Sequence, residues 1–302
     1  MRKVFVLANP DAGRGKGAVA RDAAVERLRT LGLEPSVHTA SSVAETRRLA
    51  AEAVNAKPDV LVLVGGDGTL SIVLDELVGS GVPLVLVPAG TGNDLARALG
   101  IPFGSADTAA VAAEAAMYGV PRAVDVGEAV CPEGTARFLT VAALGFDAKV
   151  SERTNRLRWP PGRARYYLAL LIELTRLTPM RFTMSVDGTE SPVSDGTLIA
   201  IGNTRTYGGG MPICPEADPH DGLLDVVHIA PLSRFQLIRL FPHLLRGTHT
   251  QLPAATTSRA AEVEVKAPGL LVYADGERIG TESVRVRTLP GALIVLLPST
   301  DA

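Results

Sequence analysis

The chain has 302 residues, 46% of them hydrophobic and only 4% aromatic, so its length and composition predict one large or two medium globular domains with an aliphatic core. The formal net charge of −2 gives no electrostatic case for binding nucleic acid. The two cysteines, Cys131 and Cys214, have neither the number of a disulfide framework nor the spacing of a metal site. No apolar run approaches the roughly 18 residues of a membrane span, and the apolar part of the N-terminus is shorter than a signal-peptide core, so we expect a cytoplasmic protein.

Strands and helices alternate over the first part of the chain. Short apolar runs predict strands at 4–8, 34–39, 60–64 and 83–87. Helical spacing and capping residues between them predict helices at 16–30, 42–55, 71–78 and 105–118. This alternation is typical of a parallel, doubly wound α/β sheet.

The third predicted strand runs directly into the turn Gly65-Gly66-Asp67-Gly68-Thr69. Glycine tolerates positive φ angles and has no Cβ to block a close ligand. The backbone amides that open the following helix are a natural seat for phosphate oxygens. An ordinary strand–turn–helix corner needs fewer glycines and no acid, so we interpret this turn as a nucleotide-binding element that includes Asp67.

Two further turns follow predicted strands. The fourth strand leads into Pro88-Ala89-Gly90-Thr91-Gly92-Asn93-Asp94, in which Thr91 offers a hydroxyl and Asn93 or Asp94 can cap a helix. Turns at the carboxyl ends of neighbouring parallel strands share one crevice, which favours the nucleotide-binding interpretation. The first turn contains GRGKG, which lacks the P-loop spacing. Its Arg14 and Lys16 fit phosphate contacts and a solvated basic turn equally well.

After Pro121 the pattern changes to short strand-like pieces separated by turn signals such as Asp275-Gly276. This spacing predicts an antiparallel β-rich domain. Helical segments interrupt it near 165–177 and 233–246, and Pro242 is expected to break or kink the second of them. The last apolar run, 292–297, is a candidate strand of the first domain. The predicted domains are 1–121, completed by 289–302, and 122–288.

Six motifs, in order along the chain, resemble the diacylglycerol kinase catalytic family, specifically the bacterial soluble lipid kinases, to which sphingoid-base kinases are related. The motifs are NPDAGRGKG, GGDGTL, PAGTGNDLAR, LGFDA, PEADPHDGLLDV and DGE. GGDGT alone also occurs in NAD kinases, whereas the GTGND block and the late DG-x-LD block favour lipid kinases. The resemblance implies an N-terminal doubly wound α/β nucleotide-binding domain, a C-terminal antiparallel β-rich domain, and an active site in the cleft between them.

The resemblance also implies roles for individual residues. ATP would contact the first two turns and two threonines, namely Asn9, Pro10, Asp11, Ala12, Gly13, Thr39, Gly65, Gly66, Asp67, Gly68, Thr69, Leu70, Ser71 and Thr91. Mg²⁺ would be held by Asp218, Asp221 and the backbone carbonyl of Leu223, which are oxygen ligands that suit a hard cation. Glu277 would accept the proton of the acceptor hydroxyl. Asp67 would orient catalytic Mg²⁺ or assist that hydroxyl.

Two positions depart from the family pattern. Ser71-Ile72 stands where the family has Asn-Glu, and Pro219 and His220 directly precede Asp221 in the metal segment. On the residues alone, Glu277 is an ordinary acid of a hairpin turn. The surrounding acids favour a metal role for Asp221 only modestly.

The favoured function is ATP-dependent transfer of the γ-phosphoryl group to a lipid hydroxyl, with diacylglycerol as the default acceptor and phosphatidic acid as the product. An NAD kinase-like small-molecule kinase and a non-catalytic nucleotide- or lipid-binding regulator are the alternatives. Segments 163–177 and 233–246 mix arginine with apolar residues, which is typical either of a helix on a membrane surface or of a helix packed on the β domain. Peripheral contact with the inner membrane face and a homodimer are the remaining partner hypotheses, and no nucleic-acid partner is expected.

Overall fold

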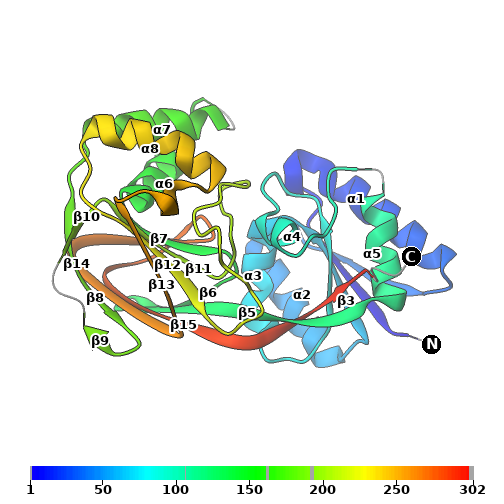
Figure 1. The fold of residues 1–302 in the computed structure, drawn as a ribbon. Coiled ribbons are helices and arrows are strands. Elements are labelled where there is room, and N and C mark those ends of the chain that lie inside the picture. Colours follow the sequence, from blue (N-terminus) through cyan, green and yellow to red (C-terminus); the bar gives the residue numbers. More distant parts are fainter. Residues whose placement is uncertain (1, 106, 161–162, 191–193, 299–302) are drawn as a thin grey trace. The chain divides into compact units, whose positions relative to one another are not determined.

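The computed structural model describes residues 2–298 except 106, 161–162 and 191–193. The chain divides into two compact units. Unit 1 consists of the residues up to Val126 and those from Pro290 onward, and unit 2 is Gly127–Leu289. The chain leaves unit 1 along β5 (Val120–Cys131) and returns to it along β15 (Glu277–Leu297) (Figure 1). An N-terminal α/β unit followed by a β-rich unit confirms the predicted fold class.

Unit 1 is built on a parallel sheet in the order β4–β3–β1–β2. Ala8 at the end of β1 is in register with Val64, and Gly65 at the end of β3 is in register with Pro88. The carboxyl ends of β1, β3 and β4 therefore lie at one edge of the sheet. The end of β15 adds in parallel to β4 at Val295. The strands are β1 (Val4–Ala8), β2 (Pro35–Thr39), β3 (Val60–Gly65) and β4 (Leu84–Pro88).

Helices cover both faces of this sheet, as expected for a doubly wound fold. Val62 and Val64 pack in one cluster with Leu28 and Ala116 of α1 and α5. The alternate residues Leu61 and Leu63 are equally buried, because α2 and α3 pack on the other side of the strands. The helices are α1 (Ala12–Thr30), α2 (Val43–Ala56), α3 (Asp67–Leu77), α4 (Asp94–Ala98) and α5 (Thr108–Tyr118).

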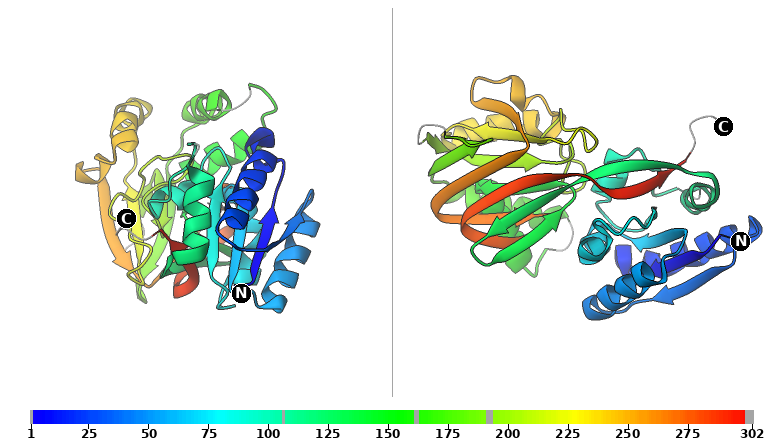
Figure 2. Two further views of the ribbon diagram at one scale, coloured as in Figure 1. Left: turned by 90° about the vertical axis from the view of Figure 1, so that its right-hand side faces the viewer. Right: turned by 90° about the horizontal axis from the view of Figure 1, so that it is seen from below.

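Unit 2 is built largely from antiparallel strands (Figure 2). Their order is β13–β12–β11–β7–β14–β15, with β8 also paired to β14. Alternating residues of these strands form an aliphatic core around Phe138 and Phe182. The remaining strands are β6 (Gly134–Phe138), β7 (Val141–Gly145), β8 (Met180–Val186), β9 (Thr189–Glu190), β10 (Ser194–Gly196), β11 (Leu198–Gly202), β12 (Leu224–Ile229), β13 (Ala255–Ala260) and β14 (Glu262–Ala274).

Unit 2 carries three α-helices in the described residues, namely α6 (Phe146–Arg156), α7 (Arg163–Thr175) and α8 (Arg234–Arg246), and a short 3₁₀ turn at His249–Gln251. The sequence pattern predicted α7 and α8 but missed α6, whose few apolar residues sit in its first turns. Of the two predicted effects of Pro242, a break or a kink, the break does not occur, since α8 continues through this residue. Burial of Leu237, Leu240 and Leu244 on the core outweighs the one backbone hydrogen bond that proline cannot donate. Among the described residues, no helix is both long and apolar enough to cross a bilayer.

Asp147 is an acid buried in the first turn of α6, within the LGFDA motif. Only 6% of the residue is exposed, and its Oδ2 atom has no hydrogen-bond partner. Burial raises the pKa of Asp147 from its ordinary 3.8 to about 6, although a hydrogen bond from Tyr207 opposes this shift. The folded state therefore binds this proton more tightly than the unfolded state does.

The pKa of Asp147 generates a prediction about stability against pH. Because the folded pKa is raised, the favourable contribution of the protonated group is complete below pH 3.8 and is lost as the pH rises through about 6. We expect Asp147→Asn to abolish this loss, so that the variant gains roughly 2–3 kcal/mol of unfolding free energy relative to the wild type between pH 4 and pH 7. Urea unfolding at a series of pH values measures the difference. The exposed Asp195→Asn is the control, and parallel pH profiles for Asp147→Asn and the wild type would refute the assignment.

Candidate active site

The turn after β3 places Asp67 at the start of a helix. Gly66 is the N-cap of α3 and Asp67 its first residue, so the helix begins four residues before the predicted start at Ser71. Thr69 and Leu70 donate their amides to the carbonyl of Gly66. A Cβ on Gly65 would lie 2.6 Å from the Thr69 side chain. The turn is therefore tight, and it presents the first amides of α3 at the edge of the sheet, where a helix favours an anion.

The turn after β4 packs directly on the turn after β3. A Cβ built on Gly66 would lie 2.7 Å from the Cα of Gly90, and one built on Gly90 would lie 2.5 Å from the Cα of Gly66. Asn93 stabilises the second turn, because its Oδ1 accepts from the Gly90 amide at 3.0 Å and its Nδ2 donates to the Gly90 carbonyl at 3.1 Å. The expected proximity of the two glycine turns is thus present, with backbone against backbone.

The carboxylate of Asp67 bridges the two turns. Its Oδ1 accepts a 2.9 Å hydrogen bond from the amide of Asp94, at the start of α4. A Cβ on Gly92 would lie 2.7 Å from its Oδ2. Glycine at position 92 therefore leaves room for the carboxylate, and the Asp94 amide determines its orientation.

The turn after β1 joins the same edge. Asn9 donates its amide to the carbonyl of Val64 at 3.0 Å and its Nδ2 to the hydroxyl of Thr69 at 3.1 Å. Gly13, in a left-handed conformation, approaches the carbonyl of Ala89 so closely that a Cβ would lie 2.0 Å from its oxygen. Turns from β1, β3 and β4 therefore form one connected group of backbone and small side chains.

The other predicted ATP contacts are distributed around this group. Thr91 is exposed on the second glycine turn. Thr39 is exposed at the end of β2, where its hydroxyl accepts from Nη1 of Arg21 at 3.2 Å. Leu70 is buried, so only its backbone can meet a ligand. The remaining predicted contacts lie on the first turn (Pro10, Asp11, Ala12) or the first turns of α3 (Gly68, Ser71).

Arg97 is a residue of this region that sequence reasoning did not weigh. Its Nη2 donates to the carbonyl of Gly92 at 3.3 Å, and its guanidinium lies over the ring of Phe103 at 4.9 Å. It thus supports the turn on which Asp67 depends. The signal was the PAGTGNDLAR block itself, in which Arg97 is the only cation.

In unit 2, the DGE motif separates into a structural acid and an exposed acid. Asp275, in the turn between β14 and β15, accepts from the amides of Leu139 and Thr140 at 2.8 and 2.9 Å and from the Thr140 hydroxyl. Glu277 is the first residue of β15, is exposed, and pairs in register with Ala274. Asp275 therefore secures the hairpin that presents the Glu277 carboxylate to solvent.

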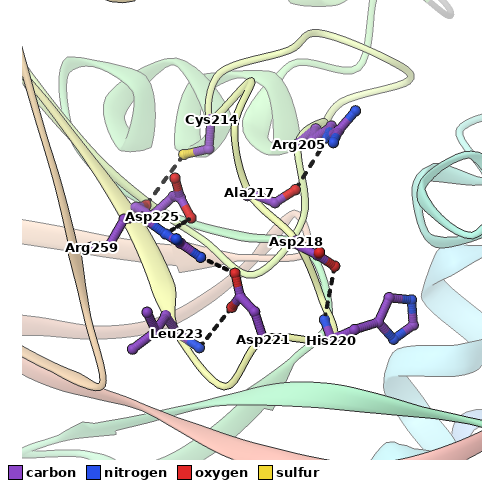
Figure 3. A network of polar contacts seen from close by, with 9 residues as sticks. All are labelled: Arg205, Cys214, Ala217, Asp218, His220, Asp221, Leu223, Asp225 and Arg259. Atoms are coloured by element: carbon purple, nitrogen blue, oxygen red, sulfur yellow. Dashed lines mark hydrogen bonds and ion pairs between the residues drawn. The ribbon is translucent and has the colours of Figure 1, made fainter.

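The predicted metal residues lie in the loop before β12, shown in Figure 3. Asp218 Oδ1 accepts the amide of His220 at 3.1 Å, and Asp221 Oδ1 accepts the amide of Leu223 at 2.9 Å. The second carboxylate oxygen of Asp221 pairs with Arg259. Arg259 belongs to β13, directly opposite Asp225 in the ladder, and its Nε lies 3.5 Å from Asp225 Oδ2.

Asp225, at the start of β12 beside this loop, is buried. Burial and the neighbouring Glu216 and Asp218 raise its pKa to about 6, while Arg205 acts in the opposite direction. Within the described residues, no three His, Cys, Asp or Glu side chains are placed so that they could hold a metal ion. The predicted ligand set consists of two carboxylates and one carbonyl, and these oxygen ligands suit Mg²⁺. In this structure the cation beside Asp221 is the guanidinium of Arg259.

The chain is similar in sequence to known lipid kinases. The diacylglycerol kinase catalytic domain matches residues 3–129, and the YegS C-terminal NAD kinase beta sandwich-like domain matches residues 140–297. A diacylglycerol kinase of Mycobacterium tuberculosis is 43% identical over 98% of this chain and 95% of its own. A Pseudomonas fluorescens protein named "Probable lipid kinase YegS-like" is 36% identical over 94% of this chain and 93% of its own.

Solved structures with lower sequence identity share the fold. A diacylglycerol kinase from Bacillus anthracis matches with a TM-score of 0.74 at 19% identity, over 100% of this chain and 98% of the other. An NAD kinase from Archaeoglobus fulgidus, solved in complex with ATP, matches with a TM-score of 0.54 at 16% identity, over 99% of this chain and 94% of the other. The family matches and the two full-length relatives together show that the chain belongs to the diacylglycerol kinase family, within its YegS-like lipid kinases.

Proposed function

We propose that this protein transfers the γ-phosphoryl group of ATP to the free hydroxyl of diacylglycerol, giving phosphatidic acid and ADP. The observation that carries the proposal is Asp67, held by the Asp94 amide where three strand-ending turns meet. The name of the mycobacterial relative supports the choice of acceptor. NAD kinases share only the fold at this level of identity, so they remain the second candidate.

The three turns supply what binding a nucleotide triphosphate requires. Glycines at 65, 66, 90 and 92 allow the turns to pack closely on one another, and the first amides of α3 lie at the edge of the sheet. We assign the ATP contacts to Asn9–Gly13, Thr39, Gly65–Ser71 and Thr91. Phosphoryl transfer asks the protein mainly for positioning and charge stabilisation, which fixed amides provide without reorganisation.

Two carboxylates have separate roles in the proposed transfer. The acceptor oxygen forms the new P–O bond, the bond between the γ-phosphorus and the bridging oxygen breaks, and ADP leaves. We assign the hydroxyl proton to the exposed carboxylate of Glu277, a transfer that typically contributes about 10²–10⁴-fold to the rate. Asp67 acts on the phosphate side, where its fixed orientation keeps its charge at one position.

Asp218, Asp221 and the carbonyl of Leu223 are the residues that would hold Mg²⁺. When bound, the ion would neutralise charge on the phosphate oxygens. Because Asp221 is paired with Arg259, the guanidinium would compete with the ion for that carboxylate. The Arg259 side chain is 48% exposed, so solvent is available to it and the pair is weak.

The first prediction from the proposed function tests the reaction and its two acids. Incubation with γ-labelled ATP, Mg²⁺ and separate acceptors should place label in diacylglycerol and none in NAD. Asp67→Asn and Glu277→Gln should each lower the rate by about 10²–10⁴-fold while the thermal unfolding profile is retained. Label in NAD alone would select the NAD kinase alternative, and label in no acceptor would select a non-catalytic regulator. Near-wild-type rates in both variants would remove the assigned acids.

A second prediction uses the space that Gly92 leaves. Gly92→Ala places a methyl group 2.7 Å from Asp67 Oδ2, so the carboxylate has to shift. We expect kcat to fall by up to about 100-fold, since small misplacements of a reacting group are costly. The double variant with Asp67→Asn should be no slower than Asp67→Asn alone, because both changes act on one carboxylate. Additive losses would show that Gly92 acts elsewhere.

A third prediction concerns Arg259. Calorimetric titration with Mg²⁺, without nucleotide or lipid, should show binding up to about fivefold tighter in Arg259→Gln than in the wild type, because a competing surface ion pair is removed. Arg181→Gln removes the exposed pair with Asp195 in the same unit and should leave the affinity unchanged. Asp221→Asn should abolish binding. Equal affinities in Arg259→Gln and the wild type would show that the guanidinium does not compete with the metal.

A further inference from the structure

The outer faces of α7 and α8 expose large apolar side chains. Phe235 is 82% exposed, Leu171 59% and Ile238 53%, and Tyr167 and Leu245 are also exposed. Single exposed apolar residues are ordinary, but a group of them on neighbouring elements marks an interaction surface. We call these five residues the apolar face of α7 and α8.

Both helices pack their inner faces on one core, so their outer faces are not required for folding. Ala169 of α7 and Leu237, Leu240 and Leu244 of α8 belong to the same buried cluster. Nη2 of Arg234, at the start of α8, donates to the carbonyl of Thr175, at the end of α7, at 2.6 Å. Figure 1 and the left view of Figure 2 both show the two helices as an outer layer on the same side of the unit 2 sheet.

No acid of α7 or α8 is exposed beside the apolar face. Arg234, Arg239 and Arg246 of α8 are exposed, and α8 contains no acid. The single acid of α7, Glu173, is buried and paired with Arg153. Exposed arginines next to Phe235, Ile238 and Leu245 can bind anionic groups while their stems lie along apolar surface.

We propose that the apolar face of α7 and α8, with its flanking arginines, docks on the surface of an anionic phospholipid bilayer. The inference rests on the proposed function, in which the acceptor is a membrane lipid. On α8 the spacing of Phe235, Ile238 and Leu245 places them on one side of the helix, so the helix lies in the membrane plane with apolar side chains in the acyl boundary. The arginines lie at the level of the lipid phosphates.

Charge complementarity selects this occupant over a second copy of the chain. Two copies meeting through this face would bring their arginines together without an acid on either α8 to balance them. An anionic bilayer neutralises all of them, and each contributes about 1 kcal/mol near such a surface, or roughly fivefold in affinity.

The test is flotation of the full chain with vesicles that contain neither diacylglycerol nor ATP. The wild type should bind vesicles of phosphatidylcholine mixed with phosphatidylglycerol, and bind phosphatidylcholine alone far more weakly. Phe235→Ser with Ile238→Ser should weaken binding by roughly tenfold or more, and Arg239→Gln with Arg246→Gln should reduce the preference for anionic lipid, leaving only the contribution of Arg234. Val19→Ser, at a residue of α1 that is 72% exposed, is the control that should bind normally.

Three results would overturn the proposal. They are wild-type protein that does not float with anionic vesicles, serine variants that float as well as the wild type, and sedimentation showing a dimer that the serine pair dissociates without any vesicle binding. Assaying the same proteins on short-chain diacylglycerol dispersed in detergent separates this inference from the kinase assignment. Wild-type protein that does not float but phosphorylates the dispersed lipid refutes the membrane face alone, and wild-type protein that floats without kinase activity refutes the proposed reaction alone.

Discussion

The hydrogen bond from the Asp94 amide to Asp67 is the contact on which the candidate site of unit 1 depends. It joins two turns that lie 27 residues apart in the chain, and it can form only because Gly66 and Gly90 allow the two backbones to touch. A side chain at either glycine would separate the turns, and one at Gly92 would displace the carboxylate. The glycines of the two motifs are therefore explained by contacts between the motifs as much as by access for a ligand.

The arrangement of unit 1 could be predicted from sequence because each of its signals is local. Apolar runs mark the strands, parallel pairing places their carboxyl ends at one edge, and the turns then have to meet. The start of α3 was predicted too late because Asp67-Gly68-Thr69 resembles loop sequence. The segment is helical because Gly66, at the end of the strand, acts as the N-cap, and its carbonyl accepts the amides of Thr69 and Leu70. Local propensity was outweighed by the tertiary position of the turn.

Unit 2 was less predictable because its decisive contacts join residues far apart in the chain. Nothing near Asp275 in the sequence indicates that its carboxylate accepts hydrogen bonds from the amides of residues 139 and 140. The pairing of Arg259 with Asp221 likewise depends on the register between β12 and β13, which turn signals do not specify. Helix α6 escaped detection because its buried acid, Asp147, breaks the apolar pattern at the point where the core begins.

Two of the buried acids of unit 2, Asp147 and Asp225, and its exposed apolar residues depart from the usual distribution of side chains in opposite directions. Burying Asp147 and Asp225 raises both pKa values and lowers stability near neutral pH. Phe235 and Ile238 leave apolar surface in water, whereas polar side chains at these positions would be well solvated. Stability alone favours neither arrangement. A residue that the fold does not require at its position is best explained by a contact outside the fold. For α8, the proposed bilayer surface offers an apolar layer to Phe235 and Ile238 and anionic groups to the exposed arginines beside them.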